Sequence, residues 1–273
     1  MRVAAIQLDT AGGHPDALDR TARLIDEAAA DGAGLVLLPE LFAVPFVQPD
    51  PDPEYFRLAE PLDGPSNVMA AERSRRHGIT VVSSVFEASA TPGVYHNTAC
   101  TYVGGELRSV YRKSHLPFSN GFPEKFYFRP GQAEPEVVDI GAAAIGTIIC
   151  YERHFPELSR IVALKGAAVL TVPVASASAP MREVFQLELR AHGIFNNLFV
   201  VCANRIGREG PKDYFGTSAV YGPDGEIIAQ AADTGDEVVA ADIDLARVTA
   251  RRESRPFFRD RRPDLYPRLA QPG

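Results

Sequence analysis

Short apolar runs alternate along this chain with longer amphipathic segments, and this alternation limits the possible folds. Residues 3–8 and 35–38 have the near-continuous apolar character of buried strands, whereas residues 15–31 carry apolar side chains at helical spacing. Gly32 and Gly34 follow that segment and are expected to end the helix. The same criteria predict helices over 66–77, 156–165 and 181–195, and strands over 79–86, 168–172, 198–202 and 238–243.

Hairpins interrupt this alternation in the middle of the chain. Alternating segments meet at Gly104-Gly105, around Gly141 and at Pro223-Asp224-Gly225, all of which favour tight turns. A mixture of βα units and hairpins predicts the α/β (or α+β) class, with a sandwich of sheets covered by helices. No linker-like change of composition occurs, so we expect a single domain over residues 1–273.

Charge and cysteine usage exclude several classes of protein. The 28 basic and 35 acidic residues give a net charge of −7, which disfavours a nucleic-acid binder. Residues 251–273 hold seven arginines and three acids, so we expect this basic tail to pack on its own body or on a partner subunit. Cys100, Cys150 and Cys202 form no CxxC pair, and no apolar stretch is long enough to span a membrane or serve as a signal peptide. These features predict a soluble cytoplasmic protein.

Polar or ionisable residues follow three predicted strands. Glu40, Lys113 and Cys150 hold these positions, where side chains from several strands can share one crevice. Alone, Glu40 and Lys113 are as well explained by solvent exposure, and His115 is either a general base or a structural loop residue. The chain lacks the GxSxG, P-loop, GxGxxG and HExxH motifs, so serine hydrolase, nucleotide-triphosphate and zincin chemistry lose support.

The three cysteines differ in their surroundings. Cys100 and Cys202 lie in or beside apolar runs and are expected to be inert core residues. Cys150 precedes a polar turn that contains Arg153 and His154, whose positive charge is expected to lower the pKa of the thiol. A Cys150–His154 metal site is poorly supported, because no other ligands follow at zinc-site spacing. Glu40 as a base, Lys113 as an oxyanion partner and Cys150 as a nucleophile would together make an acyl-transfer set.

These residues lie in sequence blocks that resemble the nitrilase superfamily of carbon–nitrogen hydrolases. The resemblance covers nearly the whole chain and is strongest in LPE at 38–40, RKSHLP at 112–117 and ICYERHFPE at 149–157. It implies an αββα sandwich that pairs into a four-layer dimer, with the tail reaching toward the partner. It also implies a Glu40–Lys113–Cys150 triad, with the backbone N–H of Tyr151 as a second oxyanion donor. No cofactor and no metal are expected.

The substrate class is also inferred from this resemblance. Glu124, in PEKFYFRPG at 123–131, matches a second glutamate that orients Lys113 and the substrate amine. The segment after Cys150 is similar to that of β-ureidopropionases and other N-carbamoyl amino acid amidohydrolases. In that reading Arg153 grips the substrate carboxylate, and His154 assists or positions it. The small side chains of residues 175–180 and the absence of tryptophan suggest a roomier pocket.

Two alternatives remain open. An ω-amidase, another aliphatic amidase or a nitrilase would use the same triad on a different substrate. A non-catalytic homologue that binds a ligand or a partner would keep the triad without using it, although the complete set with Glu124 argues against this. The expected partners are a small-molecule substrate and further copies of the chain, without nucleic acid or membrane.

Overall fold

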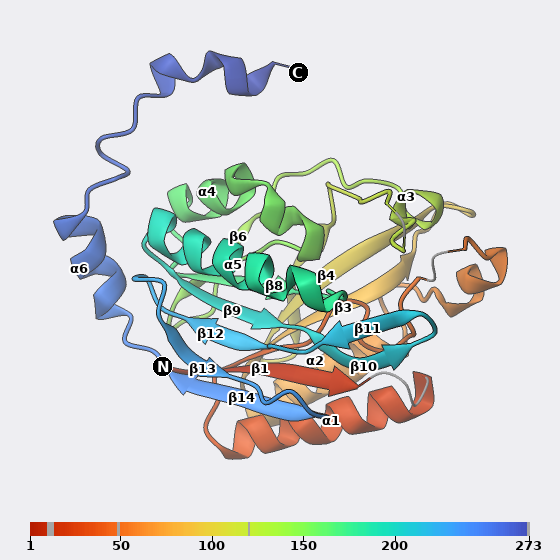
Figure 1. Ribbon diagram of the computed structural model, residues 1–273. Helices are drawn as coiled ribbons and strands as arrows, with labels where there is room; N and C mark the ends of the chain where they lie inside the picture. Colours follow the sequence, from red (N-terminus) through yellow and green to blue (C-terminus); the bar gives the residue numbers. More distant parts are fainter. Residues whose placement is uncertain (10–13, 48–49, 120, 272–273) are drawn as a thin grey trace.

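Two mixed β-sheets form the centre of the molecule (Figure 1). The structure, a computed structural model, describes residues 1–9, 14–47, 50–119 and 121–271. The first sheet has the order β11 (Lys212–Phe215), β10 (Arg205–Glu209), β1 (Arg2–Asp9), β2 (Leu35–Leu37), β3 (Thr80–Ala88), β4 (Tyr95–Val103) and β5 (Glu106–Arg112), with β14 (Glu237–Asp242) also paired to β1. The second has the order β13 (Ile227–Gln230), β12 (Ala219–Tyr221), β9 (Phe199–Ala203), β8 (Val169–Pro173), β7 (Ala144–Thr147) and β6 (Val137–Asp139).

Helices cover the outer faces of both sheets. In Figure 1, α4 and α5 lie on one side of the strands and α1 lies on the opposite side. The α-helices are α1 (His14–Ala30), α2 (Pro65–His77), α3 (Glu124–Tyr127), α4 (Pro156–Leu164), α5 (Arg182–Asn196) and α6 (Ala246–Ser254). The 3-10 helices are η1 (Pro53–Leu58), η2 (Cys150–His154), η3 (Ala179–Met181), η4 (Pro263–Leu265) and η5 (Pro267–Ala270).

Apolar side chains fill three successive layers between these elements. On β1, Val3 and Ala5 point into the layer between the two sheets, whereas Ala4 and Ile6 point into the layer beneath α1 and α2. This alternation follows from the two-residue period of a strand. The third layer, which includes Leu170, lies between the second sheet and helices α4 and α5. The predicted sandwich of two sheets between helices is therefore present within one chain.

Strand direction brings the candidate site residues to one end of the sandwich. β2 and β3 are parallel, and the antiparallel pairs β3–β4 and β4–β5 turn β5 back to the direction of β2. The residues after β2 and β5 therefore leave the first sheet at the same edge. The two sheets also meet there, because the backbone N–H of Glu40 donates to the carbonyl oxygen of Val174 at 3.3 Å.

The structure contains elements that the sequence patterns did not predict. Strands β10 and β11 carry Arg205, Glu209 and Lys212 as buried residues, so their apolar pattern is weak. Helix α6 lies in the polar C-terminal region. No described helix has the combination of length and apolar character needed to cross a membrane.

The C-terminal tail contacts the body through its first part. Arg252 donates to the carbonyl oxygen of Ala167 at 2.6 Å, and Phe258 packs against the apolar layer beneath α4 and α5. Most side chains of residues 259–271 are exposed. Figure 1 shows this last part extending past α4, away from the sheets.

Candidate active site

Two glutamates and a lysine meet in a cluster with almost no exposed surface. Glu40 follows β2, Lys113 follows β5 and Glu124 begins α3. The Nζ of Lys113 donates to Oε1 of Glu40 at 2.7 Å and to the two carboxylate oxygens of Glu124 at 2.9 and 2.8 Å. The exposed fractions of Glu40, Lys113 and Glu124 are 0%, 0% and 1%. Three of the predicted site residues are therefore in direct contact.

Asn97 on β4 joins the same cluster and was not anticipated. Its side-chain amide donates to Oε1 of Glu40 at 2.7 Å, and its backbone carbonyl oxygen accepts from the backbone N–H of Lys113 at 2.8 Å. The available signal was an asparagine within an otherwise regular strand pattern. The other carboxylate oxygen of Glu40, Oε2, is buried without a hydrogen-bond partner among the described residues. This oxygen is therefore available to accept a proton.

Burial and close contact shift the proton affinities in the cluster. Burial alone would lower the pKa of Lys113, but the carboxylates of Glu124 and Glu40 raise it above its usual range. Burial also raises the pKa of Glu124, with a further contribution from Glu40, although Lys113 opposes this. The ammonium of Lys113 is therefore maintained at neutral pH, as an electrostatic role requires.

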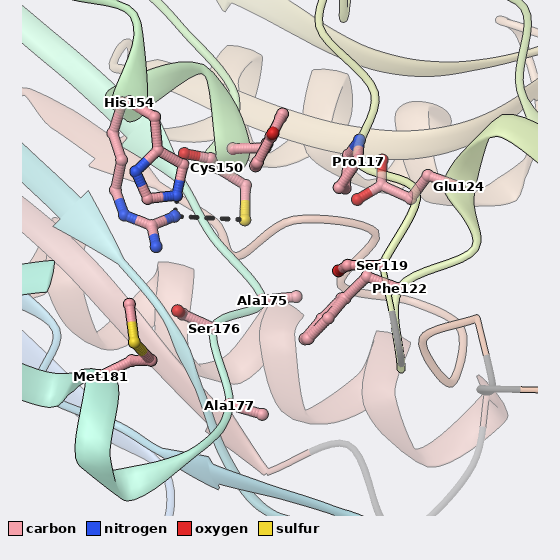
Figure 2. A pocket seen from close by; sticks show the side chains of 12 residues that line it. Pro117, Ser119, Phe122, Glu124, Cys150, His154, Ala175, Ser176, Ala177 and Met181 are labelled. Carbon is pink, nitrogen blue, oxygen red and sulfur yellow. Dashed lines mark hydrogen bonds between the residues drawn. The ribbon is translucent and has the colours of Figure 1, made fainter.

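Cys150 lies at a sharp turn between β7 and η2. Its backbone φ is +46°, in the left-handed region that costs about 1–2 kcal/mol for a residue other than glycine. This geometry resembles the turns that expose nucleophiles at strand ends. Figure 2 shows the sulfur of Cys150 pointing into a pocket, with His154 on one side of it and Glu124 on the other.

The environment of the Cys150 thiol differs from the sequence-based expectation. Burial and the charge of Glu40 raise the pKa of Cys150 to about 12. Lys113 and Arg153 lower the pKa, but by less. The thiol is therefore protonated at neutral pH: Arg153 does lower the pKa, as predicted, but burial and Glu40 outweigh it. A reaction at this sulfur would therefore require removal of the thiol proton.

The pocket beside Cys150 is small, with a volume of about 190 Å³. That size suits a ligand smaller than a typical drug molecule. Glu124 and Cys150 line it, whereas Glu40 and Lys113 have no exposed surface. The other lining residues are Pro117, Ser119, Phe122, Tyr151, Arg153, His154, Ala175, Ser176, Ala177 and Met181. Three of these lining residues, Ala175, Ser176 and Ala177, belong to the segment 175–180, whose small side chains were expected to make the pocket roomier.

A second charged group lies at the rim of the pocket. Glu188 on α5 accepts from Nε of Arg153 at 2.9 Å and contacts Nδ1 of His154 at 2.5 Å. Nη1 of Arg153 donates to the carbonyl oxygen of Cys150 at 3.1 Å and approaches its sulfur at 3.9 Å. Nη2 of Arg153 has no hydrogen-bond acceptor within the described part of the chain, so it can bind a ligand.

Two further sequence hypotheses involve Tyr151 and His115. The backbone N–H of Tyr151 lies in the first turn of η2, where donors have no acceptor within the helix. His115 contacts Oγ of Ser114 at 2.8 Å and its ring stacks near Phe155, with centroids 4.0 Å apart. It does not line the pocket, which favours the structural reading. The described residues contain no group of three or more His, Cys, Asp or Glu side chains that could bind a metal ion.

Arg205 is a buried residue whose role the sequence patterns missed. It has no exposed surface, and its guanidinium donates to the carbonyl oxygens of Glu40, Leu41 and Val44. Leu41 has a backbone φ of +50°, so this turn is strained like the one at Cys150. Arg205 therefore holds the turn that carries Glu40. The surrounding sequence, ANRIG at 203–207, gives no sign of this contact.

Known proteins resemble this chain over most of its length. The family model described as carbon-nitrogen hydrolase matches residues 2–253. An N-carbamoylputrescine amidase of Arabidopsis thaliana is 35% identical over 89% of this chain and 86% of that protein. A citrullinase of Francisella tularensis subsp. tularensis is 32% identical over 99% of this chain and 98% of that protein. The crystal structure of a carbon-nitrogen hydrolase from Helicobacter pylori G27 superposes with a TM-score of 0.93 at 31% identity, covering 100% and 98% of the two chains.

These similarities confirm the superfamily and correct one detail. The predicted closeness to β-ureidopropionases in particular is not supported, because the relatives named above are an N-carbamoylputrescine amidase and a citrullinase. The family match, the shared fold and the extent of identity lead to the same assignment. The chain belongs to the carbon–nitrogen hydrolases of the nitrilase superfamily.

Proposed function

We propose that this hydrolase cleaves N-carbamoyl amino acids, such as N-carbamoyl-β-alanine, to the amino acid, CO2 and ammonia. The observation that carries the proposal is the position of Cys150 in a small pocket, between the Glu40–Lys113–Glu124 cluster and the unpaired Nη2 of Arg153. The first group supplies acyl-transfer chemistry and the second can recognise a carboxylate.

The reaction begins with a protonated thiol. As the sulfur of Cys150 attacks the carbamoyl carbon, the unpaired Oε2 of Glu40 takes the thiol proton. The carbonyl oxygen becomes an oxyanion, which the ammonium of Lys113 and the N–H of Tyr151 stabilise. Coupling proton removal to attack explains how a thiol with a pKa of about 12 can act at neutral pH.

The tetrahedral intermediate then loses one nitrogen. Protonated Glu40 returns its proton to the leaving nitrogen, the C–N bond breaks, and a thiocarbamate remains on Cys150. Water attacks this carbonyl carbon while Glu40 accepts a proton, and Glu40 returns that proton to the sulfur of Cys150 as the C–S bond breaks. The released carbamic acid decomposes to CO2 and the second nitrogen product, so that one water is consumed overall. Glu124 holds Lys113 in place and lines the pocket beside the leaving nitrogen.

A second candidate is an N-carbamoyl compound that ends in an amine. It is favoured by the similarity to an N-carbamoylputrescine amidase. Citrulline, which carries both a carboxylate and an amine, is an intermediate case suggested by the citrullinase relative. The charge of Arg153 favours the carboxylate and opposes an amine of the same charge.

A product-release assay separates these substrates. Ammonia release is measured for N-carbamoyl-β-alanine, citrulline, N-carbamoylputrescine and a simple ω-amide, with wild type and with Arg153→Leu. We expect wild type to prefer N-carbamoyl-β-alanine, and Arg153→Leu to raise its KM by roughly 10- to 100-fold, since charge-assisted hydrogen bonds contribute about 1.5–3 kcal/mol. A preference for N-carbamoylputrescine, or an unchanged KM in the variant, would reject the carboxylate assignment.

We also propose that the chain pairs through α4 and α5. Val184, Leu187 and Phe195 are exposed along one face of α5, and Leu265 and Leu269 of the tail are 65% and 70% exposed. Exposed apolar groups of this kind mark subunit contacts. Leu187→Glu is expected to yield monomers in light scattering, whereas Ile227→Glu on β13 is the matched control. A monomeric wild type would contradict the proposal.

A further inference from the structure

One buried carboxylate touches both segments that carry reactive groups. Glu152 is two residues after Cys150 in η2 and has no exposed surface. Its Oε2 accepts the backbone N–H of Ile149 at 2.7 Å, immediately before Cys150. This hydrogen bond holds the start of the strained turn at Cys150, where φ is +46°.

The other oxygen of Glu152 binds the segment around Lys113. Oε1 accepts from the backbone N–H and the Oγ of Ser114 at 2.8 and 2.7 Å, and from the hydroxyl of Tyr111 at 2.8 Å. The backbone N–H of His115 is a weaker donor at 3.3 Å. Every one of these donors lies within two residues of Lys113.

The carboxylate of Glu152 is held by hydrogen bonds rather than by a close cation. Among the described residues, the only ion-pair partner within 4 Å is His115, whose Nδ1 lies 3.8 Å away. Burial would raise the pKa of Glu152, but the nearby His115 ring and the hydrogen bonds from Ile149, Ser114 and Tyr111 lower it below the ordinary value. The group is therefore ionised and accepts hydrogen bonds with both oxygens, which a neutral side chain cannot do equally well.

We propose that Glu152 is a positioning residue that sets the distance and orientation of the Cys150 sulfur relative to the Lys113 ammonium. Each oxygen holds one of the two segments, so the carboxylate acts as a rigid spacer between them. A displacement of about 1 Å at a reacting group can cost about 10²-fold in rate. The proposal rests on the proposed function, because it takes Cys150 and Lys113 as the reacting pair.

Glu152→Gln tests the spacer with little change of volume. An amide has only one acceptor oxygen, so its NH2 group must face either the N–H of Ile149 or the donors of the Lys113 segment. With N-carbamoyl-β-alanine we expect kcat to fall by roughly 10²-fold while KM stays close to wild type. We also expect slower alkylation of Cys150 by iodoacetamide, followed by peptide mass spectrometry.

Glu60→Gln is the matched control for loss of a buried carboxylate. Glu60 is 8% exposed and accepts the backbone N–H of Ser66 at 2.9 Å at the start of α2. It touches neither segment of the site. This variant is expected to lower Tm while kcat and the alkylation rate remain at wild-type values.

A milder variant keeps the test decisive if Glu152→Gln fails to fold. Tyr111→Phe combined with Ser114→Ala removes two side-chain donors and retains the carboxylate and its backbone partners. We expect a smaller loss of kcat, about 10-fold, without a change of KM. Wild-type kcat and alkylation in the folded variants, with only Tm lowered, would overturn the proposal.

If wild type does not hydrolyse N-carbamoyl-β-alanine, the proposed substrate fails, and the alkylation rates still decide the role of Glu152.

Discussion

Two charged clusters border the pocket, and they differ in their access to water. Glu40, Lys113 and Glu124 are at most 1% exposed, whereas the side chains of His154 and Glu188 at the rim are 30% and 23% exposed and that of Arg153, which they contact, is 6% exposed. In the interior, charges interact strongly but an unpaired charge is very costly. At the rim, water reaches His154 and Glu188, screens their charges and can replace a lost partner.

This difference suggests a division of tasks. In the proposed mechanism the inner cluster lies where bonds break, and its members contact one another through hydrogen bonds that leave little freedom. The rim cluster presents Arg153 to whatever enters the pocket. We therefore expect inner substitutions to remove the reaction, and rim substitutions to change which molecules react.

The largest effect is expected from loss of the nucleophile. Cys150→Ala should abolish ammonia release from N-carbamoyl-β-alanine while the protein remains folded, because no sulfur can form the thiocarbamate. Cys202→Ala is the matched control, since Cys202 is also buried but lies on β9 within an apolar layer. Equal loss of activity in both variants would mean that packing, not nucleophilic attack, explains the effect.

Loss of the inner cation should be nearly as severe and should also destabilise the fold. Lys113→Met removes an oxyanion partner, which typically costs about 10²–10³ in turnover. It also leaves two buried carboxylates without their cation, a change that costs about 3–5 kcal/mol in comparable pairs. The denaturant midpoint and kcat measure the two effects separately.

A double variant distinguishes these two contributions. Adding Glu124→Gln to Lys113→Met removes one of the uncompensated carboxylates. We expect part of the lost stability to return while kcat stays low. Recovery of both quantities together would show that Lys113 serves only the fold.

The smallest effect is expected at the rim. Glu188→Gln removes the charge that pairs with Arg153. Because partly exposed ion pairs are weak, we expect KM for N-carbamoyl-β-alanine to change by a few-fold while kcat stays nearly constant. An equal fall in kcat would contradict the proposed division of tasks. Glu183→Gln on the same helix provides the control.

The rim also predicts a pH dependence of stability. Burial raises the pKa of Glu188, but His154 and Arg153 lower it below its ordinary value of 4.5. Stability from this group is therefore present above that ordinary value and is lost as the pH falls through the lowered pKa. The difference in Tm between wild type and Glu188→Gln should shrink over that acid range. A difference that is constant with pH would exclude ionic stabilisation at this position.

Much of the fold was predictable because its strands and helices have regular apolar periods. The hairpin of β4 and β5, for example, shows both alternation and a glycine turn. Strands β10 and β11 were missed because buried ion pairs replace part of their apolar pattern, as in the contact between Arg205 and Glu209 at 2.6 Å. Local periodicity carries no information about partners that are distant in the chain.

The sequence predicted which residues gather at the candidate site but not their environment. Glu40, Lys113 and Cys150 follow strands and stand in recognisable blocks. The high thiol pKa depends on burial, and the contacts of Asn97, Arg205 and Glu188 depend on tertiary packing. None of these could be derived from the neighbours of each residue along the chain.

The guanidinium of Arg205 binds the turn after Glu40 across 165 positions of sequence. The terminal strands show a similar separation, because β1 pairs with β14 from Arg2 to Asp242. During synthesis on the ribosome, the turn that presents Glu40 therefore emerges long before the side chain that holds it. Contacts of such long range form slowly. We therefore expect the turn that carries Glu40 to be fixed late in folding, and a nascent chain that ends before Arg205 to be inactive even if its first strands have formed.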